Sequence, residues 1–241
     1  MQLTIQLAEA FLDQPTGVLS IHQVAKKLGI PYGTAYNRIH QMGELGLIDI
    51  VPQGKAKLCA LNPTNPMTAS ILAMGAAQAT QRFLREDTLP ARIATNTRLL
   101  FEEALSEHLH GAILLNLQAF SRLKTPENDL NPSIEAPDAG SPIELSEDDP
   151  ASPSLDMFVV LSPCDFPESR IKTALQTYFP PSLQPRVTHM VVTPLTLLGM
   201  LHERENEAGH SAFQMLRRGL ILTGFERFFS IVLKAFATRR F

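Results

Sequence analysis

The stretch SIHQVAKKLGIPYGTAYNRIHQMGEL, residues 20–45, predicts two short helices joined by a tight turn. Ser20 followed three residues later by Gln23 is the pattern of a capping box, which opens a helix over 21–28. Gly29 suits the left-handed conformation in which many helices end. Because proline is well tolerated at the start of a helix, a second helix is expected after Pro31, from about Tyr32 to Leu45. Its expected buried stripe is Ala35, Ile39, Met42 and Leu45.

The segments on either side of this stretch extend the pattern. Leu3 to Leu12 has apolar residues at helical spacing, and 47–51 and 56–61 are expected to be two short strands around a Pro/Gly turn. The string from Val24 to Ile39 resembles the helix-turn-helix of prokaryotic regulators, in which a small residue such as Ala25 lets the helices cross closely. With the two strands as a β-wing, residues 1–62 resemble a winged helix-turn-helix domain.

That resemblance implies binding to double-stranded DNA, with the second helix entering the major groove N-terminus first. The residues expected near base edges or phosphates are Tyr32, Gly33, Thr34, Asn37, Arg38 and Gln41. Asn37 and Gln41 suit adenine, whereas Arg38 suits guanine or phosphate. The lysines expected to contact the DNA backbone are Lys26, Lys27, Lys55 and Lys57. So few phosphate contacts favour a homodimer. The alternative is a domain of this shape that binds only protein.

Charge is unevenly distributed along the chain. The formal net charge is −3, yet residues 125–153 contain eight acidic side chains and no Lys or Arg. This proline-rich insert has few aromatic and β-branched residues, so we expect it to be a disordered loop. Without it the net charge would be +5, and the overall charge is therefore a poor guide to nucleic-acid binding.

The remainder of the chain is predicted to be a linker with a connecting helix (63–94) followed by a second domain (95–241). Asn62 to Pro66 contains two prolines and two asparagines, which cannot continue a strand or a helix, so it is expected to be the linker. Helices are expected over 67–85, 90–109, 167–178, 194–205, 209–221 and 224–238. Strands are expected between Gly111 and Phe120, over 155–161 and over 187–192. The whole chain is thus predicted to be an α-rich α+β protein.

This alternation of helices and strands is an α/β pattern, and residues 95–237 resemble a minimal nucleotidyltransferase domain with a helical C-terminal tail. In that family the first strand ends in Gly-Ser, the second carries Asp-x-Asp and a later strand carries a third carboxylate. The carboxylates hold divalent metals that align the nucleotide phosphates. At these positions this chain has Asn116-Leu117, Ser154-Leu155-Asp156 and Thr188-His189. One aspartate cannot replace three metal ligands, so the resemblance implies a catalytically inactive domain. Asp156 is then a weak metal candidate or a strand-end residue facing solvent.

We therefore expect a cytoplasmic, DNA-binding transcriptional regulator that is not an enzyme and has no cofactor. Its inactive body would dimerise or sense a small-molecule effector or an unidentified protein partner, with the helices Met67–Phe83 and Phe225–Phe236 as dimer surfaces. Two other functions stay open: an active metal-dependent nucleotidyltransferase, and a protein-interaction scaffold in replication or mobile-element biology.

The cytoplasmic location is expected because the sequence shows no recognisable targeting or membrane-spanning segment. No N-terminal signal peptide is recognisable, and no apolar stretch approaches the roughly 20 residues that span a bilayer, so no membrane partner is expected. Cys59 and Cys164 are expected to be buried free thiols of a reducing compartment, with a lone disulfide as the alternative.

Overall fold

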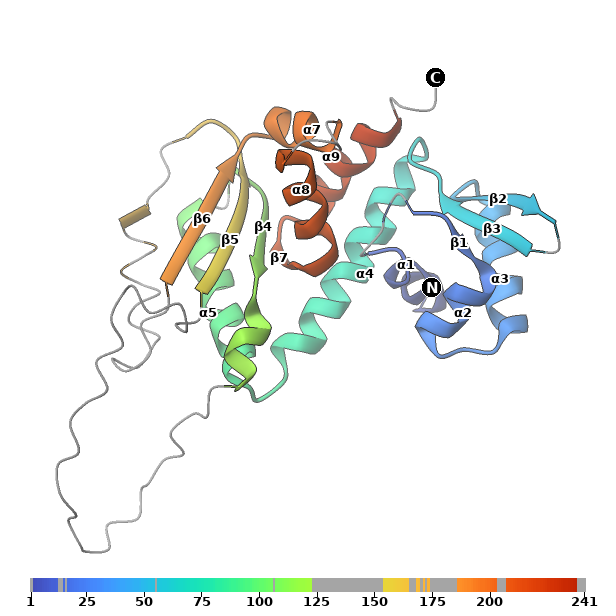
Figure 1. Cartoon of the computed structure of the whole chain (residues 1–241), viewed down its shortest axis with the longest axis horizontal. Helices are drawn as coiled ribbons and strands as arrows, with labels where there is room; N and C mark the ends of the chain where they lie inside the picture. The colour runs from blue at the N-terminus through green and yellow to red at the C-terminus, as the bar shows by residue number, and fades with distance from the viewer. Residues whose placement is uncertain are drawn as a thin grey trace, which may run out of the picture.

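The computed structural model describes residues 2–12, 15, 17–54, 56–105, 107–122, 154–164, 168–169, 171, 173, 186–202 and 207–237. Within these residues the chain is an α+β protein with eight α-helices, a three-stranded antiparallel sheet and a four-stranded mixed sheet. The two sheets lie toward opposite ends of the molecule, with a long helix, α4, between them (Figure 1).

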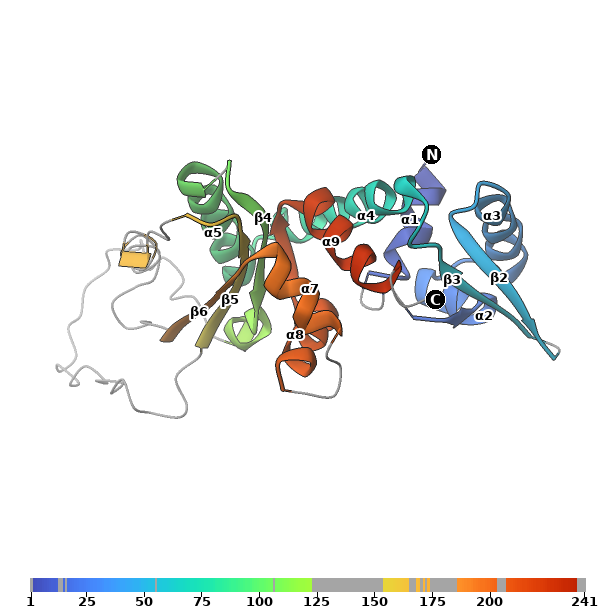
Figure 2. The ribbon, with the colours of Figure 1, turned by 90° about the horizontal axis from the view of Figure 1, so that it is seen from above.

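The smaller sheet and three helices are formed by the first 61 residues. In chain order the elements are α1 (Gln2–Glu9), β1 (Leu19–Ser20), α2 (Ile21–Leu28), α3 (Tyr32–Glu44), β2 (Ile48–Gln53) and β3 (Ala56–Leu61). The strands are arranged β1-β3-β2, and the β2–β3 hairpin projects away from the rest of the chain (Figure 2). All three predicted helices and both predicted hairpin strands are present. The two-residue strand β1 is not among the predicted elements.

The signals that open and close α2 are confirmed. The Oγ of Ser20 accepts a hydrogen bond from the backbone N–H of Gln23 (3.2 Å), and the Oε1 of Gln23 accepts one from the N–H of Ser20 (2.8 Å). Gly29 ends the helix with φ at 63°, a left-handed conformation that side-chain-bearing residues rarely adopt. The turn between α2 and α3 therefore follows from local sequence.

The predicted buried stripe of α3 is confirmed at Ala35, Ile39 and Met42, which are at most 2% exposed. It is wrong at Leu45, which is 65% exposed. The reason is that α3 ends at Glu44 and the chain reverses direction, so the apolar side chain that returns to the core is Leu47, at 2% exposure.

The predicted linker is hydrogen-bonded to the end of α3. The Nδ2 of Asn62 donates to the carbonyl of Gly46 (2.9 Å), and the Nδ2 of Asn65 donates to the carbonyl of Leu45 (3.1 Å). The Oδ1 of Asn65 also accepts the N–H of Met67 (2.9 Å), which caps α4 (Pro66–Leu84). These hydrogen bonds hold the N-terminus of α4 against the segment that follows α3.

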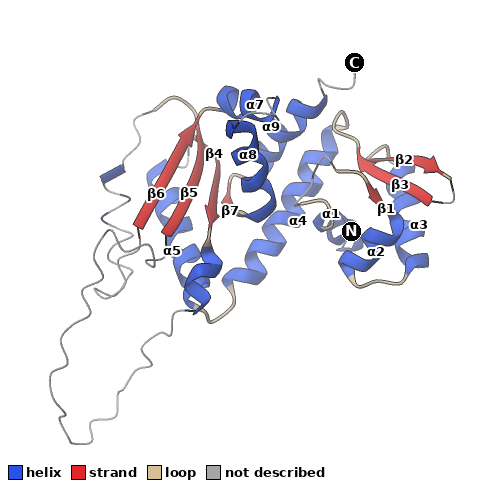
Figure 3. Cartoon of the chain, viewed as in Figure 1, coloured by secondary structure: helices blue, strands red, loops and turns tan. Residues whose placement is uncertain are grey.

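The second part of the chain is built around the four-stranded sheet (Figure 3). Its elements are α5 (Leu89–Leu105), β4 (Leu109–Leu115), a 3₁₀ turn η1 (Leu117–Arg122), β5 (Ser154–Leu161), β6 (Arg186–Val192), α7 (Pro194–His202), α8 (Glu207–Arg218), β7 (Leu220–Thr223) and α9 (Phe225–Ala237). The strand order is β6-β5-β4-β7; β4 runs antiparallel to both neighbours, and β5 runs parallel to β6.

Helices cover both faces of this sheet because its central strands are apolar on both sides. On one face, Leu114 of β4 and Val159 of β5 pack with Phe101 of α5. On the other, Ile113 and Phe158 belong to a core that includes residues of α7, α8 and α9. Alternation along the strands sends neighbouring residues to opposite faces.

Several predicted boundaries in this part are wrong. The helix expected to reach residue 109 ends at Leu105, and β4 begins at Leu109. The strand expected up to Phe120 ends at Leu115, because Asn116 has φ at 60° and turns the chain into η1. The helix expected to reach residue 221 ends at Arg218, and Leu220–Thr223 forms the unpredicted edge strand β7.

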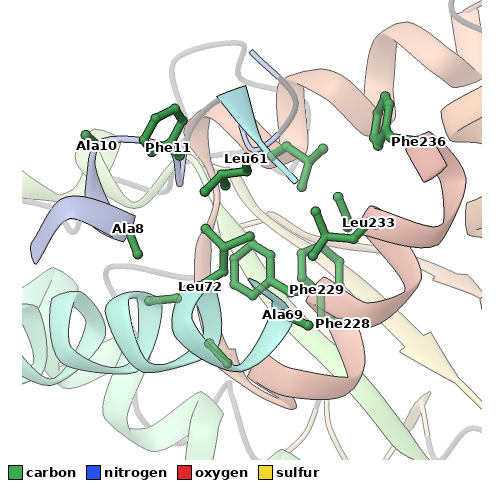
Figure 4. Packing of buried hydrophobic residues seen from close by; sticks show 14 of the residues in the cluster. Ala8, Ala10, Phe11, Leu61, Ala69, Leu72, Phe228, Phe229, Leu233 and Phe236 are labelled. Atoms are coloured by element: carbon green, nitrogen blue, oxygen red, sulfur yellow. The ribbon is translucent and has the colours of Figure 1, made fainter. Parts of the chain in front are cut away.

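One hydrophobic core joins the first unit to the second through α4 (Figure 4). Phe11 and Leu61 belong to the same cluster as Leu72 of α4 and Phe228 and Phe229 of α9. Most apolar residues of α9 are buried within this chain, and only Phe225 is half-buried, so α9 leaves little apolar surface for the expected dimer contact. On α4, Met67 and Met74 remain 60% and 44% exposed.

Some predictions lie wholly or largely outside the described residues: Lys55, the acidic insert 125–153 and the helix over 167–178. None of the helices that the structure describes combines the length and apolar character that crossing a bilayer requires.

Candidate nucleic-acid interface

The six residues predicted to face DNA form the exposed side of α3. Tyr32, Gly33, Thr34, Asn37, Arg38 and Gln41 are all exposed, opposite the buried stripe of the same helix. Apart from the neighbouring backbone of the helix itself, no heavy atom lies within 4 Å of the position that a Cβ on Gly33 would take, so the first turn is open on this side. The helix therefore presents polar side chains and accessible backbone to solvent at its N-terminal end.

Arg38 and Gln41 are coupled to each other on this face. The Nη1 of Arg38 donates a hydrogen bond to the Oε1 of Gln41 over 2.9 Å. A residue pair three positions apart on a helix is in contact range. The guanidinium keeps further donors for a second partner, and the Gln41 amide keeps its N–H donors.

Lys57 of β3 fastens the hairpin to α3. Its Nζ donates to the Oη of Tyr36 (2.7 Å), lies 3.2 Å from the Nε2 of His40 and stands 4.7 Å from the centroid of the Tyr36 ring. The Tyr36 ring in turn packs against His40 and Tyr32, at centroid distances of 4.3 Å and 6.1 Å. We refer to Tyr32, Tyr36, His40 and Lys57 as the aromatic–lysine cluster.

Tyr36 and His40 are functional candidates that the sequence does not single out. Their helical positions indicate only that they point away from the buried stripe, and their role depends on the position of Lys57 in the hairpin. The one signal that the sequence offers is the spacing of Tyr32, Tyr36 and His40, which places ring side chains one helical turn apart.

The remaining lysines differ in their surroundings. Lys26 is exposed in the last turn of α2. The Nζ of Lys27 donates to the carbonyl of Ala10 over 3.1 Å, which ties α2 to the end of the first helix. Lys26 is therefore the freer phosphate contact of the two, and the prediction for Lys55 concerns a residue outside the described part.

The positions matched to the nucleotidyltransferase motifs meet where β4 ends and where β5 and β6 begin. Asp156 of β5 lies opposite Leu115 of β4 and opposite Thr188 of β6. The Nδ2 of Asn116 and the Oγ1 of Thr188 each donate a hydrogen bond to one carboxylate oxygen of Asp156. The weak metal candidate is thus the acceptor at the centre of a polar trio.

This trio does not fit a pair of divalent metals. Such a site needs several carboxylates, and here one carboxylate has both oxygens engaged by neutral donors. Among the residues that the structure describes, no group of three or more His, Cys, Asp and Glu side chains is arranged to hold a metal ion. No phosphoryl-transfer step can be derived from these residues.

Three further side chains could take part in chemistry: His110, Cys59 and Cys164. The Nε2 of His110 lies 2.7 Å from the Oγ of Ser162, and burial together with the nearby Arg227 guanidinium lowers the pKa of His110. The thiol of Cys59 is buried and donates to the carbonyl of Leu19, and burial raises its pKa to about 11. Both cysteines are free, but Cys164 is exposed, so the prediction that both are buried is wrong.

Comparison of the chain with protein-family models, with curated proteins and with solved structures found no match.

Proposed function

We propose that this chain is a DNA-binding transcriptional regulator that reads duplex DNA with α3 of an N-terminal winged helix-turn-helix. The observation that carries the proposal is the exposed face of α3, where six residues able to contact bases or phosphates stand opposite a fully buried stripe. A helix that needed this face for its own fold would not leave Asn37, Arg38 and Gln41 in solvent.

The chemistry of that face matches the major groove. Amides such as those of Asn37 and Gln41 pair with the N6 and N7 of adenine, and a guanidinium such as that of Arg38 pairs with guanine or phosphate. The aromatic–lysine cluster holds the hairpin beside α3. This contact supports the proposal because a helix in the groove and a wing over the backbone need a constant spacing. Lys26 adds a free positive charge on the adjacent helix.

For the second part of the chain we propose a nucleotidyltransferase-like body without catalytic activity. The observation that favours this over an active enzyme is the polar trio, in which Asp156 is engaged by Asn116 and Thr188 instead of by further carboxylates. A thermal-shift titration with ATP and Mg²⁺ tests this point. We expect no change in melting temperature, and a magnesium-dependent rise would favour the enzyme.

We also propose that the regulator acts as a homodimer. The exposed methionines of α4, Met67 and Met74, provide apolar surface on the helix that carries the DNA-binding unit. Two recognition helices on a two-fold axis would read two half-sites and double the phosphate contacts. Analytical ultracentrifugation of the wild type and of Met67→Glu tests this, with dissociation of the variant expected.

The test of DNA binding begins with selection of duplexes from a random-sequence pool by the full-length protein. The selected duplex and a scrambled version are then titrated by fluorescence anisotropy at about 50 mM and about 200 mM salt. We expect the selected duplex to bind more tightly and its affinity to fall steeply with salt, because phosphate contacts release counterions.

Variants connect this binding to α3. Asn37→Ala and Arg38→Ala should each weaken specific binding by about 1–3 kcal/mol. The matched control is Arg92→Ala, an exposed arginine of α5 that pairs with the exposed Asp87 and lies outside the proposed interface. If both α3 variants bind like the wild type, the assignment of α3 as the recognition helix is wrong. If neither duplex binds, the protein-interaction alternative replaces the proposal.

A further inference from the structure

Tyr36 lies between α3 and the hairpin, and its hydroxyl oxygen accepts a hydrogen bond from Lys57. The distance from the Nζ of Lys57 to the Oη of Tyr36 is 2.7 Å. A lysine ammonium carries donors only, so the hydroxyl hydrogen of Tyr36 takes no part in this bond and points away from Lys57. Accepting a hydrogen bond from a cation also polarises the hydroxyl, which makes its own hydrogen a stronger donor.

This hydrogen has no acceptor within the part of the chain that the structure describes. The polar and ring contacts of Tyr36 there are the bond and the cation–π contact with Lys57 and the ring contacts with Tyr32 and His40. The side chain of Tyr36 is half-buried, so part of it faces solvent. The hydroxyl is therefore a donor that is oriented from inside the protein and open to a partner from outside the chain.

The charge around this hydroxyl favours an anionic partner. Lys57 makes no ion pair with any described residue, so its positive charge lies beside the hydroxyl without a neutralising carboxylate. Arg38 adds a second positive charge on α3, whereas the one acidic residue of this helix, Glu44, is its last residue. The Nε2 of His40 lies 3.2 Å from the Nζ of Lys57 and accepts from it, which leaves the ring hydrogen on Nδ1 as a further donor.

We propose that the hydroxyl of Tyr36 donates a hydrogen bond to a phosphate oxygen of the DNA backbone, with Lys57 behind it as the group that orients it. The inference rests on the proposed reading of duplex DNA by α3. Tyr36 directly precedes Asn37 and faces the hairpin, so it lies where a DNA strand would pass between the helix and the wing. A phosphate oxygen suits a polarised donor beside a cation, and contacts of this kind fix position without reading sequence.

The first test removes the hydroxyl alone. Tyr36→Phe keeps the ring beside the ammonium of Lys57, so the cation–π contact remains and the melting temperature should stay within a few degrees of the wild type. We expect the affinity for the selected duplex to fall about two- to tenfold, because one hydrogen bond is lost. The dependence of affinity on salt should not change, because a neutral hydroxyl releases no counterion.

The same loss is expected for versions of the selected duplex that carry single base-pair changes, since a backbone contact is common to all sequences. A loss that disappears when one particular base pair is replaced would mean that Tyr36 reads a base, and it would overturn the proposal. An affinity of Tyr36→Phe equal to that of the wild type would overturn it as well.

The second test separates a direct contact from a structural role. Each phosphate of the selected duplex is replaced in turn by an uncharged methylphosphonate, and the loss of affinity is measured for the wild type and for Tyr36→Phe. We expect the two proteins to differ at one linkage, where the variant loses about two- to tenfold less than the wild type because its contact is already absent. A structural role would weaken binding to every duplex equally, and identical profiles would therefore refute the contact.

Lys26→Met is the matched comparison, because it removes an exposed lysine that is expected at a different phosphate. It should differ from the wild type at another linkage and should lower the salt dependence, which Tyr36→Phe leaves unchanged. If the wild type binds DNA but Tyr36→Phe has the same profile, only the inference about Tyr36 fails. If the wild type binds no duplex, the proposed function fails and this inference fails with it.

Discussion

Replacing Lys57 with methionine removes the charged group that fastens the hairpin to α3. The substitution keeps most of the aliphatic stem and deletes the ammonium that contacts Tyr36 and His40. The hydrogen bond to the Tyr36 hydroxyl is short, at 2.7 Å, and involves a charged donor. Such bonds contribute about 1.5–3 kcal/mol when they are well shielded. The cluster is only half-buried, so a value near the lower end applies.

The cation–π contact adds a smaller amount. With the Nζ 4.7 Å from the Tyr36 ring centroid, a partly exposed pair contributes about 0.5–1 kcal/mol. Recovered solvation of the tyrosine hydroxyl and the apolar contacts of methionine offset part of the loss. We therefore expect Lys57→Met to lower the free energy of unfolding by about 1–2 kcal/mol, which for a chain of this length corresponds to a melting temperature lower by about 2–8 °C.

Thermal and urea unfolding followed by circular dichroism measure this change. The control is Lys26→Met, which removes an exposed lysine of α2 and should leave stability within about 0.5 kcal/mol. In DNA titrations both variants should differ from the wild type, each in a different way. Lys26→Met should reduce the salt dependence by about one phosphate contact, whereas Lys57→Met should mainly weaken binding at all salt concentrations. If Lys57→Met is as stable as the wild type, the ammonium does not hold the hairpin and our account of the aromatic–lysine cluster is wrong.

Three further outcomes are expected. At pH 8 a thiol reagent should modify the exposed Cys164 quickly and the buried Cys59, whose pKa is raised to about 11, only on unfolding; two fast thiols would contradict this. Gly219→Ala should destabilise the protein by about 3 kcal/mol in urea unfolding, because its Cβ would lie 2.6 Å from the Met215 carbonyl oxygen; unchanged stability would show that the chain relaxes there. Since the pKa of His110 is lowered in the folded state, its contribution to stability is complete above the ordinary histidine pKa and is lost as pH falls through that value toward the folded pKa. His110→Gln should therefore show a flatter stability profile between about pH 7 and pH 5, and an identical profile would contradict the shift.

The parts of the fold that could be predicted are those governed by local interactions. Ser20 and Gln23 cap the start of α2 and Gly29 ends it, so the sequence of this one helix predicts both ends, and the structure confirms them. The same is true of Ala35, Ile39 and Met42, whose spacing alone selects one side of α3.

The features that could not be predicted depend on contacts distant in sequence. Strand β7 is four residues long and lies between two helices, so its apolar run cannot be distinguished from a helix end until β4 is beside it. Leu45 follows the helical spacing but lies beyond the point at which α3 stops.

In the candidate sites, too, some features follow from local sequence and others from contacts between distant residues. Exposure of Asn37, Arg38 and Gln41 follows from helical spacing, whereas the contact of Lys57 with Tyr36 requires the hairpin to fold back on α3. The comparison of motifs had named all three positions of the polar trio, but the hydrogen bonds to Asp156 from Asn116, in the turn after β4, and from Thr188, on β6, depend on how the strands pair.

The most direct test of the central claim measures base specificity position by position. Each base pair of a selected binding site is replaced in turn, and the loss of affinity is determined for the wild type and for Asn37→Ala. We predict that the wild type loses about 1–3 kcal/mol at each contacted pair and that Asn37→Ala loses this penalty at one A·T pair while keeping it elsewhere. Identical specificity profiles for the two proteins would contradict the claim that α3 reads the DNA.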